Sequence, residues 1–498
     1  MLNDIQTGVT GPRLLLGGLA LAPLLFLLTC IHRRYLSPLS KYPGPFWASV
    51  TDLWLIELHK QYGSVVRLKP NKLSISCPEA FKVIYGAGNN FVKSEFYSPM
   101  LGKRPFDLAA QRNERIHGQQ RRLVAGAYTL ETMKSLEPYV NTTIQVLLDK
   151  LREVGAKGQA VDIAYLIQLF AFDVIGEVSF GKRFGYVEAL SDFGIFEQIR
   201  AALASAARVG EVPWFYQLHQ RLASLIGNHL ALAARNGSLH DFTLRAIAAR
   251  RDSGGADDGT PSAGAGEEHH GVMLSKLLDA RRSKPQLSES DIGFALTSNV
   301  TAGSDTTSIS LSAMIYYLLT TPPALQRLLR EMRDKVDAGE INRAGIVSQR
   351  AVINEGLRLH PALGVLLPRV VPPQGLSFEG KRVPAGTEVG TSAWVIHRDP
   401  SIFGPEPDEF RPERWLDEEN KHKMHRFFFA FGGGSRTCIG RNIAMLEISK
   451  VLPTLFLHFD IKFTNAHDHP KEHYGGLVAF RPFHVVVQQR NVRHTAEA

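Results

Sequence analysis

Hydrophobic residues are spaced differently in successive parts of the chain, beginning with an uncharged run near the N-terminus. Residues 14–31 read LLLGGLALAPLLFLLTCI, and as a helix this run would be about 27 Å long, close to the hydrocarbon thickness of a bilayer. Basic residues 32–34 follow it, which favours a cytosolic position for the rest of the chain. We therefore expect a single-pass membrane anchor over residues 1–35. A cleaved signal peptide is the alternative, but Asp4 and the lack of a small-residue cleavage site disfavour it.

Short elements follow the anchor. Residues 36–46 contain three prolines and predict a stiff, non-helical spacer. Two runs of alternating or β-branched residues, 63–68 and 73–77, predict strands that are joined by a turn at 70–71. Cys77 ends the second strand, and we expect it to be a buried packing residue.

Apolar residues stand mostly at helical spacing from residue 131 to 251. The low-complexity stretch 252–271 predicts a mobile surface insertion between helices, because the motifs described below lie on both sides of it. We expect helices at 288–320, 324–337 and 346–359, followed by short strand-like segments between 366 and 396. The pattern predicts a mainly α-helical body with a small β subdomain, forming one domain over residues 47–498.

Composition and charge narrow the possible classes of protein. Hydrophobic residues make up 44% of the chain and charged residues 21%, which is ordinary for a globular protein with a large core. The three cysteines are far apart, so no disulfide framework is expected. The net charge of +9 comes from scattered residues without a nucleic-acid-binding module, so we expect no nucleic-acid partner.

One cysteine lies in a glycine-rich loop, FGGGSRTCIG at 431–440. A thiolate in such a loop is suited to be the axial ligand of a haem iron, because glycines let the backbone pass close to a flat ring and leave amides free to face the sulfur. The segment resembles the haem-binding signature of the cytochrome P450 family at every fixed position. The resemblance implies a cytochrome P450 fold, haem b as cofactor and these signature residues: Phe431, Gly434, Arg436, Cys438 and Gly440.

A second motif, AGSDTT at 302–307, lies within the predicted long helix. Glycine and small hydroxyl residues weaken a helix locally, and we expect a local widening there that seats a small ligand and water. The stretch resembles the oxygen-activation motif of the family, which implies that Asp305 and Thr306 are the catalytic proton-relay residues. A polar helix face without a catalytic role is the alternative.

A charge network is implied by two further segments. Glu355 and Arg358 are neighbours on one helix face, and Phe410 to Trp415 precede the cysteine loop. By resemblance, Glu355, Arg358 and Arg414 form the structural charge triad of the family, which fixes the cysteine loop. Trp415 stands where phenylalanine is usual.

The haem carboxylates require cationic partners. The resemblance implies Arg436, Arg369 and Arg121 for this role, together with His117, which stands where tryptophan is frequent. A basic surface face is the alternative for Arg121 and its neighbours. Substrate-facing segments are implied at 96–106, 299–303, 362–367 and 475–480, although plain core is equally compatible with their apolar residues.

Function follows from the resemblance. It implies a monooxygenase that inserts one oxygen atom from O2 into an apolar small molecule, with electrons from NADPH through a separate NADPH–cytochrome P450 reductase. The expected location is the endoplasmic reticulum membrane, with the catalytic domain in the cytosol. The reductase would dock on a basic flank of the cysteine loop that comprises Lys421, Lys423, Arg426 and Arg441. Segments 42–46 and 51–54 resemble fungal family members of secondary metabolism.

Two alternatives stay open at this point. One is an enzyme of the same fold that rearranges or dehydrates a substrate without external oxygen, and the other is a non-catalytic membrane haem protein. One departure from the family also stands out. Only about seventeen residues separate Pro45 from the first strand, where related members carry a longer stretch.

Overall fold

The computed structural model describes residues 53–102, 104–226, 240–248 except 242 and 246, 271–337, 347–465 and 469–490. The predicted membrane anchor (1–35), the spacer (36–46) and all but the last residue of the predicted insertion (252–271) lie outside these residues.

Helices dominate the described part of the chain. The longer ones are α2 (Leu53–Tyr62), α3 (Pro78–Tyr85), α5 (Glu114–Val124), α6 (Leu130–Ala156), α7 (Ile163–Phe180), α9 (Ile195–Gly210), α10 (Pro213–Ile226), α13 (Met273–Ser283), α14 (Glu289–Thr320), α15 (Pro322–Asp337), α16 (Val347–Leu359), α19 (Glu418–Phe427) and α20 (Arg441–His458). Short helical turns are α4 (Ser98–Leu101), α8 (Tyr186–Ala189), α17 (Ala393–Ile396), α18 (Pro400–Phe403), η2 (Glu95–Tyr97), η3 (Ala125–Tyr128), η6 (Pro412–Leu416) and η7 (Gly434–Arg436).

The strands form four small sheets. The largest has the order β1-β2-β7-β4, in which β2 and β7 are parallel and the other neighbours are antiparallel. The others pair β3-β11-β8, β9-β10 and β5-β6. Their bounds are β1 (Val65–Lys69), β2 (Lys72–Ile75), β3 (Val161–Asp162), β4 (Arg369–Val370), β5 (Leu376–Phe378), β6 (Lys381–Val383), β7 (Glu388–Gly390), β8 (Phe459–Phe463), β9 (Lys471–Tyr474), β10 (Val478–Arg481) and β11 (His484–Gln489).

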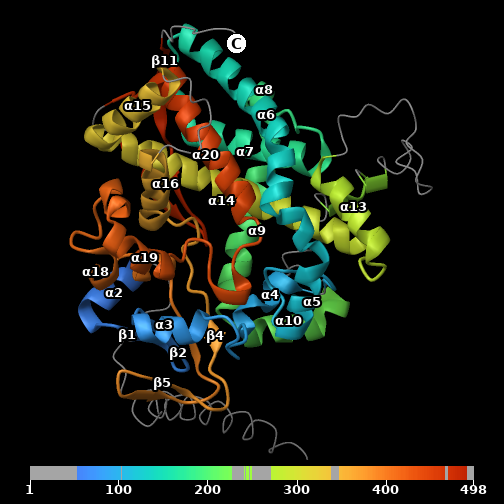
Figure 1. Cartoon of the computed structure of the whole chain (residues 1–498). Helices are drawn as coiled ribbons and strands as arrows, with labels where there is room; N and C mark the ends of the chain where they lie inside the picture. The colour runs from blue at the N-terminus through green and yellow to red at the C-terminus, as the bar shows by residue number, and fades with distance from the viewer. Residues whose placement is uncertain are drawn as a thin grey trace, which may run out of the picture.

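The two kinds of structure occupy different parts of the molecule. Figure 1 shows β1, β2, β4 and β5 with α2 and α3 at one end, and α6, α7, α14 and α20 in the helical remainder. The mainly α-helical architecture with a small β part is as predicted. The predicted strands and turn near residue 70 correspond to β1 and β2, and Cys77 is buried at the start of α3.

Helix α14 is the central element. It begins at a capping box in which the Ser288 hydroxyl accepts from the Asp291 amide and the Asp291 carboxylate accepts from the Ser288 amide. It packs against α7 and α20, and ends where Pro322 begins α15. The structure assigns α-helix from Glu289 to Thr320, so Gly303 and its neighbours do not interrupt α14.

Helix α7 is the most apolar helix of the core. Of the helices that the structure describes, it is the one long and apolar enough to cross a membrane, but 83% of that stretch is buried in the protein. Such burial is expected of a helix packed on all sides within a large core. It lies against α14 and α6.

Candidate functional site

The loop before α20 holds Cys438 in a constrained backbone. The Cys438 amide donates to the Phe431 carbonyl at 2.8 Å, which closes the loop, and α20 starts after Gly440. Gly434 has φ +59°, and a Cβ there would overlap the carbonyl oxygen of Tyr85. Glycine is therefore required at this position for both conformation and space. The loop therefore packs at Gly434 directly against the backbone of Tyr85 at the C-terminal end of α3.

The Cys438 side chain is accessible even though protein surrounds it. Burial raises the pKa of its thiol, and the Gly440 and Arg441 amides and the Arg121 guanidinium oppose that effect. Amides that face a sulfur atom stabilise its anionic form, and a bound metal would complete the shift to thiolate. The sulfur is thus accessible and faced by groups that favour a metal-bound thiolate.

Helix α14 presents an accessible stripe at helical spacing. Asn299, Ala302, Gly303 and Thr306 are exposed or half-buried, whereas residues 307–314 behind them are buried. Tyr128 connects this helix to the cysteine region, because its hydroxyl donates to Asn299 Oδ1 at 2.7 Å and its carbonyl accepts from Asn442 on α20 at 2.9 Å. The accessible stripe and the accessible sulfur therefore belong to one neighbourhood.

The predicted relay residues have different partners. The Thr306 hydroxyl donates to the Ala302 carbonyl at 2.7 Å, within the stripe. Asp305 is 2% exposed and turns toward α7, where its Oδ1 accepts from the Gln168 side-chain amide. Its Oδ2 is buried and has no hydrogen-bond partner within the described residues. Burial raises the pKa of Asp305, and Arg481, Gln168 and Arg200 oppose that effect.

The predicted charge triad is assembled by α16 and η6. Arg358 donates to both oxygens of Glu355 at 2.8 Å, and Arg414 Nε donates to Glu355 Oε1 at 2.9 Å. The Arg411 amide also donates to Oε1 at 2.9 Å. Burial alone would raise the pKa of Glu355, but these donors outweigh it and hold the pKa below its usual range.

Trp415 adds a donor to this network. Its indole Nε1 donates to Glu355 Oε2 at 2.8 Å, an interaction that the usual phenylalanine lacks. From the sequence, Trp415 differs from phenylalanine only in its aromatic ring, but in the structure its indole N–H contacts the Glu355 carboxylate. Glu355 is fully buried and receives five hydrogen bonds from these four residues.

Buried cations gather near the cysteine loop. Arg369 and Lys93 are 4% and 8% exposed. Burial, then the charges of Arg369 and Arg436, lower the pKa of Lys93 well below its usual value. Burial and the same group of cations, with Arg121, lower the pKa of His117 to about 3, so that His117 is neutral. Lys93 was missed by the sequence reasoning, because nothing in its local pattern marks it as buried.

Arg436 has a partner that the sequence does not indicate. Its Nε and Nη2 contact the Glu114 carboxylate on α5 at 2.6–3.1 Å. Its Nη1 is buried without a hydrogen-bond partner in the part of the chain that the structure describes. One nitrogen is thus available for a ligand, while Glu114 takes the rest. Of the Arg436 guanidinium nitrogens, Nη1 is therefore the one left for the predicted contact with a haem carboxylate.

The excess of buried positive charge tests whether haem fits. Glu114 is matched by Arg436, and Asp107 is paired with Arg104. Arg369 then lies buried without a carboxylate ion pair among the residues that the structure describes, which is costly unless an anion joins it, and an anion beside Lys93 would oppose the lowering of its pKa. A haem carries two carboxylates, and its iron takes a thiolate ligand of the kind that Cys438 could supply. The donor set fits that cofactor.

Two of the predicted substrate-facing segments are joined. The Gly364 amide donates to the Gly476 carbonyl at 3.1 Å, and the Val478 amide donates to the Ala362 carbonyl at 3.0 Å. A Cβ added at Gly476 would lie 3.6 Å from Ala207 on α9. Segments 362–367 and 475–480 therefore form one surface next to α9.

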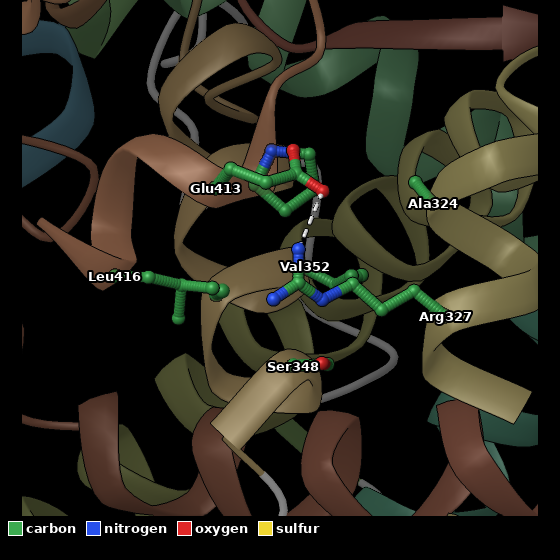
Figure 2. Close-up of a pocket in the computed structure, with 8 residues that line it drawn as sticks. Ala324, Arg327, Ser348, Val352, Glu413 and Leu416 are labelled. Atoms are coloured by element: carbon green, nitrogen blue, oxygen red, sulfur yellow. Dashed lines mark ion pairs between the residues drawn. The ribbon is translucent and has the colours of Figure 1, made fainter. Parts of the chain in front are cut away.

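A small hollow lies elsewhere, between α15, α16 and η6 (Figure 2). Arg327 and Glu413 face each other across it, with Nη1 and Oε1 separated by 3.5 Å. Both side chains are about half exposed, and none of the predicted site residues lines the hollow. We interpret it as a surface depression between packed elements.

Comparison with known proteins agrees with the geometry. The model of the family "Cytochrome P450" matches residues 51–486. The chain is similar to the cytochrome P450 monooxygenase hepC of Aspergillus oryzae, at 40% identity over 88% of this chain and 90% of that protein. It is also similar to a pisatin demethylase of Fusarium vanettenii, at 35% identity over 88% and 87% of the two chains. The fold matches the crystal structure of the cytochrome P450DA heme domain with a TM-score of 0.74 at 19% identity, covering 90% and 98% of the two chains.

Proposed function

The chain belongs to the cytochrome P450 family and is a haem monooxygenase, and we propose that it inserts one oxygen atom from O2 into an apolar small molecule of fungal secondary metabolism. Electrons would come from NADPH through a separate reductase. The observation that carries the proposal is the accessible Cys438 sulfur, faced by backbone amides and accompanied by buried cations.

Haem, when bound, supplies the activation of O2. The residues of this chain would hold and tune it. Cys438 would hold the haem iron through its sulfur, with the amides of Gly440 and Arg441 stabilising the sulfur anion. Lys93, Arg369 and the free Nη1 of Arg436 would bind the cofactor carboxylates. His117 and Arg121 complete this donor set.

Proton supply would come from α14. Thr306 lies on the accessible stripe of the helix and its hydroxyl can hold a water molecule on that side. Asp305 lies on the neighbouring face, where burial favours its neutral, proton-carrying form. The substrate would lie against the joined segments 362–367 and 475–480, whose exposed side chains include Leu363.

Membrane association is supported by two apolar features. One is the uncharged run 14–31, which lies outside the described residues. The other is the outer face of α10, where five large apolar side chains are 41–83% exposed: Trp214, Phe215, Leu218, Leu222 and Leu225. Apolar patches of this kind are typical of membrane or protein contacts. We propose a single-pass protein of the endoplasmic reticulum whose α10 face also touches lipid.

Reductase docking is proposed on the basic flank of the cysteine loop. Arg441 lies beside the loop, with its guanidinium 5.6 Å from the centre of the Phe431 ring. Lys421, Lys423 and Arg426 on α19 provide further positive charge. Electron transfer should therefore slow as ionic strength rises, because screening weakens contacts between exposed charges.

The reduced carbon-monoxide spectrum of the purified full chain tests the proposal. Thiolate ligation predicts the red-shifted absorption band of the family, and Cys438→Ala should abolish it. Cys77→Ala is the matched control, since Cys77 is buried in the β part and should leave the band unchanged. A histidine-type spectrum in the wild-type protein would refute thiolate ligation, and product formation without NADPH would refute the monooxygenase reaction.

A further inference from the structure

A hydrogen-bonded bridge connects Asp305 to two arginines. Gln168 on α7 is fully buried, and its amide nitrogen donates to Asp305 Oδ1. The carbonyl oxygen of the same side chain accepts from Arg481 Nη2 at 2.6 Å and from Arg200 Nη1 at 3.4 Å. The three partners come from α14, from the end of β10 and from α9. One side chain thus joins three elements that are distant in the sequence.

The bridge leads from the buried carboxyl toward the surface. Asp305 is 2% exposed and Gln168 is 0% exposed. Arg481 and Arg200 are both half-buried and reach solvent. Asp192 and Asp162 lie behind Arg481 and interact with it electrostatically. On this side the Gln168 amide and the two arginine side chains lie between the Asp305 carboxyl and solvent.

The Gln168 side chain fits this position in both of its halves. A carboxylate needs a donor and an arginine needs an acceptor, and an amide offers both in one group. An apolar residue would leave Arg481 and Asp305 without these partners inside the protein. A charged residue would repel one side. The Gln168 amide can therefore serve the Asp305 carboxyl and the two arginines at the same time.

We infer that Gln168 is a positioning residue for Asp305. It holds the Asp305 carboxyl toward α7 and couples it to Arg481 and Arg200. The seam between α7, α9 and β10 is then the side from which the carboxyl regains a proton. The inference rests on the proposed role of Asp305 in proton supply. Oδ2, which has no partner among the described residues, is the oxygen that exchanges the proton.

Charge determines the direction of the expected effect. The Gln168 donor and the charges of Arg481 and Arg200 each stabilise the carboxylate and oppose the rise that burial causes in the pKa of Asp305. Removing the amide, as in Gln168→Leu, or the nearer cation, as in Arg481→Gln, should raise that pKa further. We expect the proton affinity of Asp305 to increase about tenfold in Gln168→Leu, and less in Arg481→Gln.

Infrared difference titration of the purified full-length protein measures this quantity without substrate. The carboxylic-acid band that is missing in Asp305→Asn identifies Asp305, and its intensity is followed against pH. Ser179→Ala is the matched control, because Ser179 lies buried on the same helix α7 and its hydroxyl has no hydrogen-bond partner among the described residues. Its titration midpoint should equal that of the wild type.

A second readout connects the bridge to turnover. The share of NADPH electrons lost as hydrogen peroxide should change with pH around the same midpoint, and that midpoint should move upward in Gln168→Leu. If Gln168→Leu does not fold, Arg481→Gln gives the same test with a smaller shift. An unchanged Asp305 titration in the folded variants would overturn the inference. A shifted titration with no NADPH consumption in any protein would support the bridge and count against the proposed function.

Discussion

Glu355 and Asp305 are the same chemical group at nearly equal burial, 0% and 2% exposed, yet their surroundings drive them in opposite directions. Glu355 receives five hydrogen bonds and its pKa is lowered. Asp305 receives one from Gln168, keeps one oxygen without a partner among the described residues, and its pKa is raised. Burial is the same cost in both cases, and the number of donors decides the outcome.

The difference separates a carboxylate that holds structure from one that is able to change charge. A carboxylate saturated with donors cannot give or take a proton near neutral pH without losing several contacts. A carboxyl with a free oxygen and few donors can do so at little structural cost. Perturbed groups of the second kind are typical of functional sites.

The largest expected effect comes from breaking the saturated carboxylate. Glu355→Gln leaves Arg358 and Arg414 buried without a counter-charge, and we expect a loss of about 3–5 kcal/mol in the free energy of unfolding. Haem incorporation should fall with it, measured as the haem absorbance per protein. The control is Glu413→Gln in the same turn η6, whose partner Arg327 is half exposed at 3.5 Å. Equal losses in the two variants would contradict the comparison.

Breaking the open carboxyl should affect turnover and leave the fold intact. Asp305→Asn keeps the shape of the side chain but cannot carry an exchangeable acid proton, and we expect product formation to fall about 100-fold. Haem content should stay near wild type. Asp291→Asn is the control on the same helix, because it weakens only the capping box. A wild-type rate in Asp305→Asn would remove Asp305 from the mechanism.

Stability against pH sharpens the contrast through opposite signs. The pKa of Asp305 is raised in the folded state. Above the pKa of an unfolded aspartate, about 3.9, the unfolded chain loses this proton while the folded protein keeps it, which favours unfolding. The stability of wild type relative to Asp305→Asn should therefore decrease as the pH rises from about 4 toward the folded pKa, by about 1.4 kcal/mol for each pH unit in that interval. Glu355 has a lowered pKa, so its contribution is present above about 4.3 and is lost as pH falls through the folded pKa. Urea unfolding across this pH range measures both trends.

A smaller effect is expected from the extra donor on Glu355. Trp415→Phe removes the indole N–H and leaves four of the five hydrogen bonds, so we expect a loss of about 1.5 kcal/mol in unfolding free energy. Trp394→Phe is the matched control, since that indole donates to the neutral carbonyl of Pro361 at 2.9 Å. A larger loss in the control would mean that the charge of Glu355 adds nothing to this contact.

Local sequence was informative where a site is built from consecutive residues. The cysteine loop at 431–440 and the pair Glu355 and Arg358 each lie within one short segment, so their spacing reveals them. The long helix α14 was likewise visible, because it starts at the Ser288 capping signal and ends before Pro322.

Long-range partners were invisible for a physical reason. Gln168 meets Asp305 from 137 positions away, and Glu114 meets Arg436 from 322 positions away. Glu114 is ordinary in the first turn of its helix, and Gln168 is a polar residue within the apolar run of α7, but no local pattern identifies the partner of either. Lys93 is similar, since only the packed structure shows that a lysine is buried among arginines.

The joined segments 362–367 and 475–480 have a consequence for protein engineering. Backbone hydrogen bonds and the Leu363–Leu477 bridge make the two segments one unit that rests on α9. A chimera that imports only one segment from a relative would combine surfaces that were never selected together. Under the proposed placement of the substrate, exchanges intended to alter what this protein oxidises should therefore move both segments at once, and the effects of single substitutions there should not add.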